Sequence, residues 1–167
     1  FFANYFDFQN TKSVRPTYNT YLKKHLVNLD PSKYLPKDSL QAFQSYTDYP
    51  LCREFMENLK KEISQLSSDI DLPYTFKCHG KLSLDNIFYD KKMFYFDDFQ
   101  SVFMGHPFLD FTDLLLELGI SEEIQYKLLH EFCNKGQIKE DRNFFIKLYE
   151  IQLRKKLGDL ISEYIKE

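Results

Sequence analysis

The segment from Cys78 to Asp113 carries the side chains of this chain that are best suited to chemistry. In chain order, the residues of interest are His79, Gly80, Lys81, Asn86, Asp97, Asp98, Gly105, His106, Pro107 and Asp110. An amide and several carboxylates at such intervals could hold Mg²⁺, whose protein ligands are oxygen atoms. Phosphoryl transfer needs metal ligands, a group that orients the attacking hydroxyl, and charge directed at the transferring phosphoryl group. The segment is therefore a candidate for phosphoryl transfer.

Short elements must hold these residues in place. Asn86–Tyr89 and Met93–Phe96 are apolar runs on either side of three polar residues, and this pattern predicts a β-hairpin. Asp110–Leu118 has apolar residues at helical spacing and is expected to be a helix. The hairpin should therefore carry Asn86 at its start and the Asp97-Asp98 pair at its end.

Helical periodicity covers most of the remaining chain. The expected helices are Arg15–Asn28, Lys37–Tyr46, one that follows an Asp48 N-cap, one that follows a Ser121 N-cap and ends at Gly136, and one that begins at Asp141. Their expected apolar faces are Leu51, Phe55, Leu59, Ile63 and Leu66; Ile124, Leu128 and Phe132; and Phe144, Phe145, Leu148, Ile151, Leu157, Leu160, Ile161 and Tyr164. Residues 1–14 are aromatic and then polar, which predicts a linker or hinge that enters the domain.

The composition is that of a globular domain, with 43% hydrophobic and 28% charged residues. A chain of 167 residues is long enough to form one domain with a buried core. Its 17 Phe and lack of Trp predict a core built around Phe and Leu. We therefore predict an α+β fold that is mostly α, in which helices over residues 1–167 surround one central β-hairpin and residues 78–113 form the functional core.

Charge and cysteine usage limit the classes of partner. The net charge is −3 and the basic residues are scattered, so nucleic acid is not expected as a partner. No apolar run approaches the roughly 20 residues of a membrane span, so no membrane partner is expected either. Cys52, Cys78 and Cys133 are isolated from one another in the sequence, which favours a reducing, cytoplasmic setting and no zinc site. The sequence leaves the oligomeric state open.

The order of residues in this segment resembles the aminoglycoside phosphotransferase and choline kinase family, whose members are relatives of the protein kinases. The usual family pattern is H-G-D-x-x-x-x-N, then a hairpin and an Asp, then G-D-P-x-x-D. In this chain His79, Gly80 and Asn86 match the first part of the pattern. Asp98 lies seven residues before Gly105, which is the family spacing of the metal-binding aspartate, and the last Asp of the pattern is matched by Asp110.

This resemblance implies a protein-kinase-like C-terminal lobe that transfers the ATP γ-phosphoryl group to a hydroxyl of a small molecule, with Mg²⁺ and ATP as cofactors. It implies that Asn86 and Asp98 hold the metal and that His79 and Asp110 brace the loop. No Gly-rich phosphate loop and no V-A-I-K-like strand lysine occur in the sequence. The chain is therefore expected to be the C-terminal lobe alone, without the N-terminal nucleotide-binding lobe.

Two residues depart from the family pattern. Lys81 stands where the family has its catalytic aspartate, which accepts the proton of the substrate hydroxyl. Loss of such a general base typically costs about 10²–10⁴-fold in rate. The Lys81 ammonium should also compete with Mg²⁺ for acidic ligands, or it could neutralise a phosphate as a point charge. The second departure is His106, which replaces the aspartate of G-D-P.

Two functions stay open on this basis. One is a degenerate phosphotransferase lobe that acts, or once acted, on a small hydroxylated substrate. The other is a non-catalytic, pseudokinase-type module that binds a ligand or a protein partner. A third interpretation, a plain helical interaction domain, requires that Asn86 and Asp98 do not converge. His79 is expected to be a structural histidine and Cys78 a buried, inert thiol.

Overall fold

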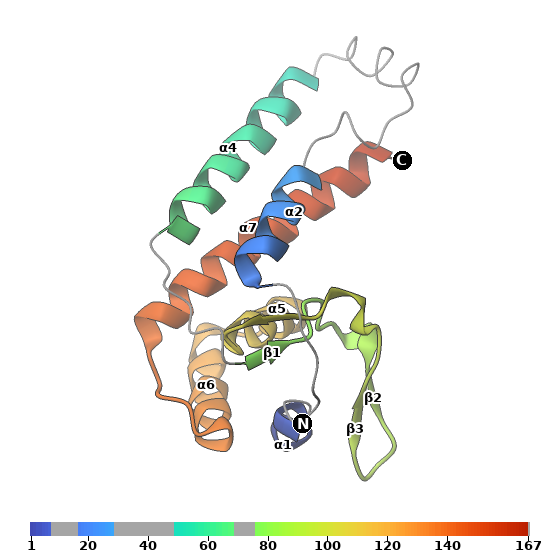
Figure 1. Cartoon of the computed structure of the whole chain (residues 1–167), viewed down its shortest axis with the longest axis vertical. Coiled ribbons are helices and arrows are strands. Elements are labelled where there is room, and N and C mark those ends of the chain that lie inside the picture. Colours follow the sequence, from blue (N-terminus) through green and yellow to red (C-terminus); the bar gives the residue numbers. More distant parts are fainter. Residues whose placement is uncertain (8–16, 29–48, 69–75, 167) are drawn as a thin grey trace. The chain divides into compact units, whose positions relative to one another are not determined.

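The computed structural model describes residues 1–7, 17–28, 49–68 and 76–166 (Figure 1). Its helices are α1 (Phe2–Asp7), α2 (Tyr18–Asn28), α4 (Tyr49–Ser68), α5 (Phe108–Leu118), α6 (Glu122–Gly136) and α7 (Arg142–Lys166), with 3-10 turns η3 (Leu84–Asn86) and η4 (Phe99–Ser101). Its strands are β1 (Phe76–Cys78), β2 (Ile87–Tyr89), β3 (Phe94–Phe96) and β4 (Phe103–Gly105). The predicted class, α+β and mostly α, is confirmed. The helix expected over Lys37–Tyr46 and the cap at Asp48 lie outside the described residues.

The chain divides into two compact units. The first unit comprises Phe1–Tyr18 and Leu72–Tyr149, and the second comprises Asn19–Asp71 and Glu150–Glu167. The first unit therefore contains the whole segment with the candidate chemistry, and α7 contributes residues to both units. The assignment of residues 1–167 to a single helical lobe stays a prediction.

The first unit contains two small antiparallel sheets. Strands β2 and β3 form the predicted hairpin, in which Ile87 lies opposite Phe96. At its turn the Asp90 carboxylate accepts hydrogen bonds from the backbone N–H groups of Lys92 and Met93. Strand β1 pairs with β4, so that Cys78 lies opposite Phe103. This pairing brings the chain that follows Cys78 next to the residues that follow the hairpin.

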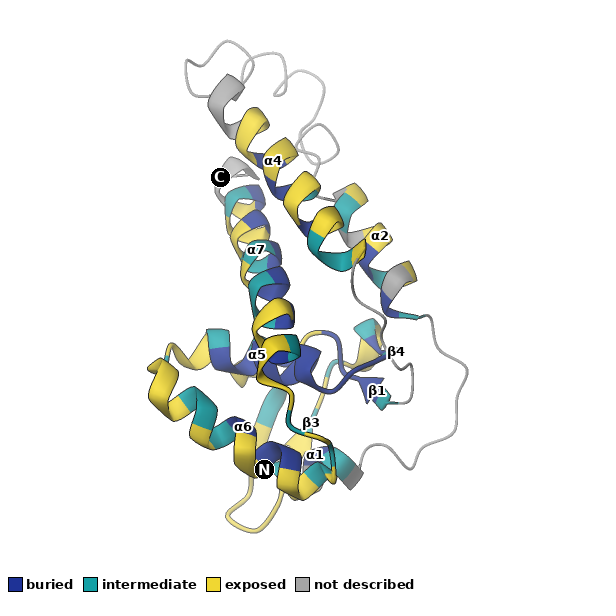
Figure 2. Cartoon of the chain, turned by 90° about the vertical axis from the view of Figure 1, so that its left-hand side faces the viewer, coloured by how far each residue is buried: buried dark blue, intermediate teal, exposed yellow. Residues whose placement is uncertain are grey.

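Aromatic rings fill the core of the first unit, as the abundance of Phe predicts. The rings of Phe111 on α5 and Phe132 on α6 stack with their centroids 4.5 Å apart. Buried positions run along the facing sides of α5 and α6 in Figure 2. The fully buried large side chains of this unit are Tyr5, Tyr18, Phe103, Phe108, Phe111, Phe132, Leu109, Leu115 and Leu129. Burial of such rings is the main source of stability around the site.

The assignment of residues 1–14 to a linker is wrong for the first residues. Phe2–Asp7 is the helix α1, and its Tyr5 is only 2% exposed. The Phe2 ring packs edge-on against Phe132, with 5.2 Å between the centroids. A segment with this many aromatic side chains is stabilised by burying them, and α6 supplies the surface. Residues 8–14 lie outside the described part of the chain.

Helix α6 buries only part of the predicted face. Phe132 is buried and Leu128 half-buried as predicted, but Ile124 is 46% exposed, and Leu129 and Cys133 are buried as well. Gly136 is the last residue of the helix, and the left-handed cap conformation falls on Gln137, with φ 51°. A side chain on Gly136 would collide with the ring of Phe6 from α1. Close packing against α1, rather than helix termination, therefore favours glycine here.

The apolar faces predicted for the second unit need correction in part. On α4, Leu59 and Ile63 are buried as predicted, whereas Phe55 is 41% exposed and Met56 is buried. On α7, Leu157 and Leu160 are 40% and 55% exposed. The side chains buried in their place on this part of the helix include Gln152, Lys155 and Ser162.

Hydrogen bonding explains why polar side chains are buried in this part of α7. The ammonium of Lys155 donates to Gln152 Oε1 at 2.7 Å and lies 4.9 Å from the centre of the Tyr21 ring. The Ser162 hydroxyl donates to the carbonyl oxygen of Gly158. Polar groups with such partners can be buried at little cost, so apolar periodicity alone misplaces the buried face.

Candidate functional site

The loop after β1 is tied to the start of α5 by one buried carboxylate. Asp110 is fully buried, and its Oδ2 accepts a hydrogen bond from the backbone N–H of His79. Its Oδ1 accepts another from the backbone N–H of Gly80, at 2.8 Å. The Tyr5 hydroxyl donates a third hydrogen bond to Oδ2, also at 2.8 Å. One side chain thus joins the loop, helix α5 and helix α1.

Burial changes the proton affinity of this cluster. Desolvation raises the pKa of the Asp110 carboxyl, and the backbone N–H groups of Gly80 and His79 act in the opposite direction. Desolvation, followed by the nearby Asp110, also raises the pKa of Tyr5 well above its ordinary value. The Tyr5 hydroxyl therefore stays protonated and remains a hydrogen-bond donor over the physiological pH range.

The His79 side chain links the loop to the end of the hairpin. The side chain is buried, and its Nε2 lies within hydrogen-bond distance of the carbonyl oxygen of Asp97. A carbonyl oxygen can only accept, so Nε2 carries the proton. Within the described ranges, Nδ1 of this ring has no hydrogen-bond partner. The imidazole therefore acts as a tether between two backbone segments.

Asp98 follows this tether in an unusual backbone conformation. Its φ of 58° and ψ of 55° place it in the left-handed region, just before η4. Its backbone N–H donates to Oδ1 of Asp97 at 2.7 Å, which holds the peptide in that orientation. Non-glycine residues adopt this region rarely, and such residues are concentrated at functional sites.

Lys81 connects the loop to Asp98 directly. Its Nζ lies 3.2 Å from Oδ2 of Asp98, in an ion pair whose side chains are 65% and 29% exposed respectively. Asn86 contacts the same lysine from the start of the hairpin, because its Nδ2 donates to the Lys81 carbonyl oxygen at 2.8 Å. Each of the two predicted metal ligands thus contacts Lys81, Asn86 at the backbone carbonyl oxygen and Asp98 at the ammonium.

The arrangement does not fit a divalent cation at Asp98. Mg²⁺ requires several oxygen ligands at about 2.1 Å, and a carboxylate already paired with an ammonium is a poor ligand for it. Over residues 1–7, 17–28, 49–68 and 76–166, no group of three His, Cys, Asp or Glu side chains is placed to hold a metal. The metal-ligand roles of Asn86 and Asp98 therefore stay predictions.

Cys78 and His106 lie behind the loop. Cys78 is fully buried, and its Sγ donates to the carbonyl oxygen of His106 at 3.2 Å. Burial raises the pKa of this thiol well above its ordinary value, so the thiol is not a reactive nucleophile. The His106 ring accepts a hydrogen bond at Nδ1 from the backbone N–H of Phe108 and packs edge-on against the Phe144 ring.

His106 makes the stability of the fold depend on pH. Burial lowers its pKa to about 4, from an ordinary value of 6.5, while Asp141 acts in the opposite direction. Folding therefore favours the neutral ring, whose contribution is complete above pH 6.5 and is lost as the pH falls from 6.5 to 4. We expect urea unfolding to show a loss of about 3 kcal/mol across this window that is due to His106.

The matched variant is His106→Asn, which keeps an acceptor for the Phe108 N–H but cannot titrate. Its free energy of unfolding should vary less between pH 6.5 and 4 than that of the unmodified protein. Parallel pH profiles for the two proteins would contradict a buried neutral His106.

Tyr5 was not predicted from the sequence as part of the site, and Gly80 was predicted as part of the motif but without its structural role. Tyr5 lies in a segment assigned to a linker, and only its place in an aromatic cluster hinted that it is buried. Gly80 has a φ of 82°, and a Cβ at this position would collide with the carbonyl oxygen of Ser101. The His-Gly pair in the motif is the signal for that close approach. Asp85 is the carboxylate nearest to Lys81 along the sequence, and it is exposed on η3.

No helix in the described parts of the chain has the length and apolar character needed to cross a membrane. No protein-family sequence model and no curated protein sequence matches the chain. Its structure is similar to that of choline kinase LicA from Streptococcus pneumoniae, with a TM-score of 0.58 at 15% sequence identity over 98% of this chain. LicA in complex with AMP gives a TM-score of 0.59 at 16% identity over 97% of this chain.

The chain spans about half the length of these proteins, since the alignments cover 55% and 52% of the LicA chains. At this level of identity the likeness establishes the fold. It is consistent with the prediction that the chain corresponds to the C-terminal lobe. The chain therefore has a fold similar to that of choline kinase LicA, as the resemblance between His79 and Asp110 predicts.

Proposed function

We propose that this protein is a degenerate kinase-like phosphotransferase, which binds a nucleotide at the loop of residues 79–98 but does not transfer its γ-phosphoryl group efficiently. The observation that carries the proposal is the place of Lys81. An ammonium replaces the expected catalytic carboxylate and is paired with Asp98, while Asp110 holds the backbone of His79 and Gly80 in the same loop.

Nucleotide binding is supported by the tethers that keep the loop in shape. Asp110 holds the backbone of His79 and Gly80, and the His79 ring holds the Asp97 carbonyl oxygen. These contacts place the Lys81 ammonium at the surface of the unit, where it can meet a phosphate. The fold is shared with a kinase whose structure was determined with AMP.

Inefficient transfer is supported by charge. A lysine ammonium has no lone pair with which to accept the proton of an attacking hydroxyl. The bound lysine also occupies the Asp98 carboxylate that a catalytic metal would need. A Mg²⁺ ion held by Asn86 and Asp98 would supply positive charge against the charge that develops during transfer, and the paired lysine disfavours its binding.

A paired assay tests this function. Binding of ATP is measured by calorimetry, and ADP release is measured with choline as the first acceptor, because the solved relative is a choline kinase. We expect the protein to bind ATP while its ADP release does not exceed that of Asp98→Ala. Lys81→Asp restores a carboxylate and should raise ADP release at least about tenfold, given the usual worth of a general base.

The matched control is Lys139→Asp, which makes the same change of charge at an exposed lysine between α6 and α7. It should leave both readings unchanged. Acceptor-dependent ADP release by the unmodified protein that is lost in Asp98→Ala would contradict the proposal, because the site would then transfer phosphoryl groups with Asp98 in use. Absence of ATP binding at millimolar concentration would contradict nucleotide binding itself.

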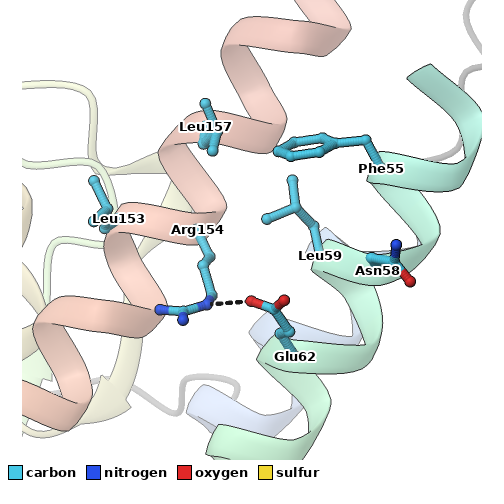
Figure 3. A pocket seen from close by; sticks show the side chains of 7 residues that line it. All are labelled: Phe55, Asn58, Leu59, Glu62, Leu153, Arg154 and Leu157. Carbon is cyan, nitrogen blue, oxygen red and sulfur yellow. Dashed lines mark hydrogen bonds and ion pairs between the residues drawn. The ribbon is translucent and has the colours of Figure 1, made fainter. Parts of the chain in front are cut away.

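Protein binding is a second candidate function, favoured by an exposed apolar hollow in the second unit. The hollow has a volume of about 300 Å³. Figure 3 shows Phe55 and Leu59 of α4 facing Leu157 of α7, beside the ion pair of Glu62 with Arg154. Apolar side chains this exposed are typical of surfaces that contact another protein. A photo-crosslinker at position 157, but not at position 139, should then capture a defined partner.

A further inference from the structure

We infer that the ammonium of Lys81 takes the place of the divalent cation at Asp98, so that this centre excludes the metal and binds the phosphates of a nucleoside triphosphate without it. This inference rests on the proposed function and specifies its ligand chemistry. It concerns one contact, the 3.2 Å approach of Lys81 Nζ to Asp98 Oδ2.

The carboxylate in this contact is held in place by the backbone. Asp98 has a left-handed conformation, fixed by the hydrogen bond from its own N–H to Asp97 Oδ1. The carbonyl oxygen of Asp97 is in turn held by the buried ring of His79. The backbone position of Asp98 is therefore fixed, and Lys81 contacts the Asp98 carboxylate from the neighbouring loop.

The backbone of Lys81 is held in place, and its side chain is exposed. Its carbonyl oxygen accepts a hydrogen bond from Asn86, and the preceding Gly80 is tied to the buried Asp110. Its side chain is 65% exposed, so the ammonium keeps donors directed at solvent while one contacts Asp98. An ammonium with three donors can thus bridge the carboxylate and a phosphate oxygen, which is the electrostatic role of a bound metal ion.

The same contact argues against a metal. A cation that ligated Asp98 Oδ2 would lie within a few ångströms of the ammonium, and like charges at that distance repel. An exposed ion pair of this kind adds little to folding stability, so its effect should appear in ligand binding. Substitutions of Lys81 should therefore leave the fold intact and change only the metal and phosphate affinities.

Metal binding provides the first test. Mn²⁺ affinity is measured by electron paramagnetic resonance for the unmodified protein, Lys81→Ala, Lys81→Asp and Lys81→Asp with Asp98→Ala, with Lys139→Ala as the control for charge. We expect Lys81→Asp to bind Mn²⁺ at least about tenfold more tightly than the unmodified protein. The double variant should lose that gain, and Lys139→Ala should show none. Equal Mn²⁺ affinity, within about threefold, in the unmodified protein and Lys81→Asp would overturn the inference.

Nucleotide binding provides the second test. ATP is titrated by calorimetry in EDTA and again in Mg²⁺. The unmodified protein should bind ATP in EDTA at least as tightly as in Mg²⁺, and Lys81→Ala should weaken the binding in EDTA about tenfold or more. Binding of the unmodified protein that requires Mg²⁺ would overturn the inference. If ATP binds in neither condition, the proposed function fails, whereas exclusion of the metal is decided by the Mn²⁺ titration alone.

Discussion

Replacing Asp110 with alanine is expected to destabilise the protein by about 4 kcal/mol, among the largest losses that a single substitution can cause. The side chain is fully buried and accepts three hydrogen bonds, two from the backbone N–H groups of the loop and one from the Tyr5 hydroxyl. In Asp110→Ala all three donors would be buried without partners, and each such donor costs about 1–3 kcal/mol. Urea unfolding measures the loss, and the melting temperature should fall by roughly 10 °C.

Asp90 offers a matched control for this prediction. Its carboxylate also accepts two backbone hydrogen bonds, from Lys92 and Met93, and one from the Tyr95 hydroxyl. It differs in being exposed at the hairpin turn. Asp90→Ala should therefore cost much less, because water replaces the lost acceptor. If the two alanine variants lose similar stability, burial is not what makes Asp110 important.

Tyr5→Phe separates the parts of this network. It removes one donor and leaves the two backbone hydrogen bonds of Asp110 in place, so the loss should be about 1 kcal/mol. The link between Tyr5 and Asp110 joins residues 105 positions apart. Such a link depends on how helices pack, and no local pattern in the sequence around Tyr5 specifies it. This is why the sequence suggested a linker where the structure has a helix.

The parts of the fold that could be predicted are those set by local spacing. The β2–β3 hairpin follows from two short apolar runs around a polar turn, and α5 follows from apolar residues at helical intervals. The buried faces could be predicted only in part, since Ile63, Phe132 and Leu148 are buried as expected, whereas Phe55, Ile124 and Leu160 are exposed. On α7 the burial of Lys155 depends on Tyr21 and Gln152, which apolar periodicity does not register.

The candidate site shows the same division. The motif predicted that Asn86 and Asp98 lie near the loop, and the structure places both in contact with Lys81. The structural likeness to choline kinase LicA argues against a chance match of the motif. The left-handed conformation of Asp98 could not be predicted, because it is imposed by the Asp97 side chain and by the turn into η4. Contacts within a motif can be inferred from spacing, whereas backbone conformations set by close packing cannot.

Gly80→Ala is expected to destabilise the loop by roughly 3 kcal/mol and to separate Lys81 from Asp98. The glycine has a φ of 82°, which costs an alanine about 1 kcal/mol or more. The added Cβ would also collide with the backbone carbonyl oxygen of Ser101 and come within 3.0 Å of the Phe103 ring. A backbone atom cannot move aside as a side chain can, so the collision should cost a further 1–3 kcal/mol. The loop and the η4 turn would have to separate to relieve it.

Gly119 makes the test selective, because it shares the positive φ without the crowding. Its φ is 58°, at the C-terminal cap of α5, and no atom lies within 4 Å of a Cβ built there. Gly119→Ala should therefore lose only about 1 kcal/mol on urea unfolding, which is the conformational cost alone. The difference between the two variants measures the closeness of the loop to Ser101. Equal losses would mean that the loop is not held against η4, and that the ion pair of Lys81 with Asp98 lacks the rigid base that the proposed ligand site requires.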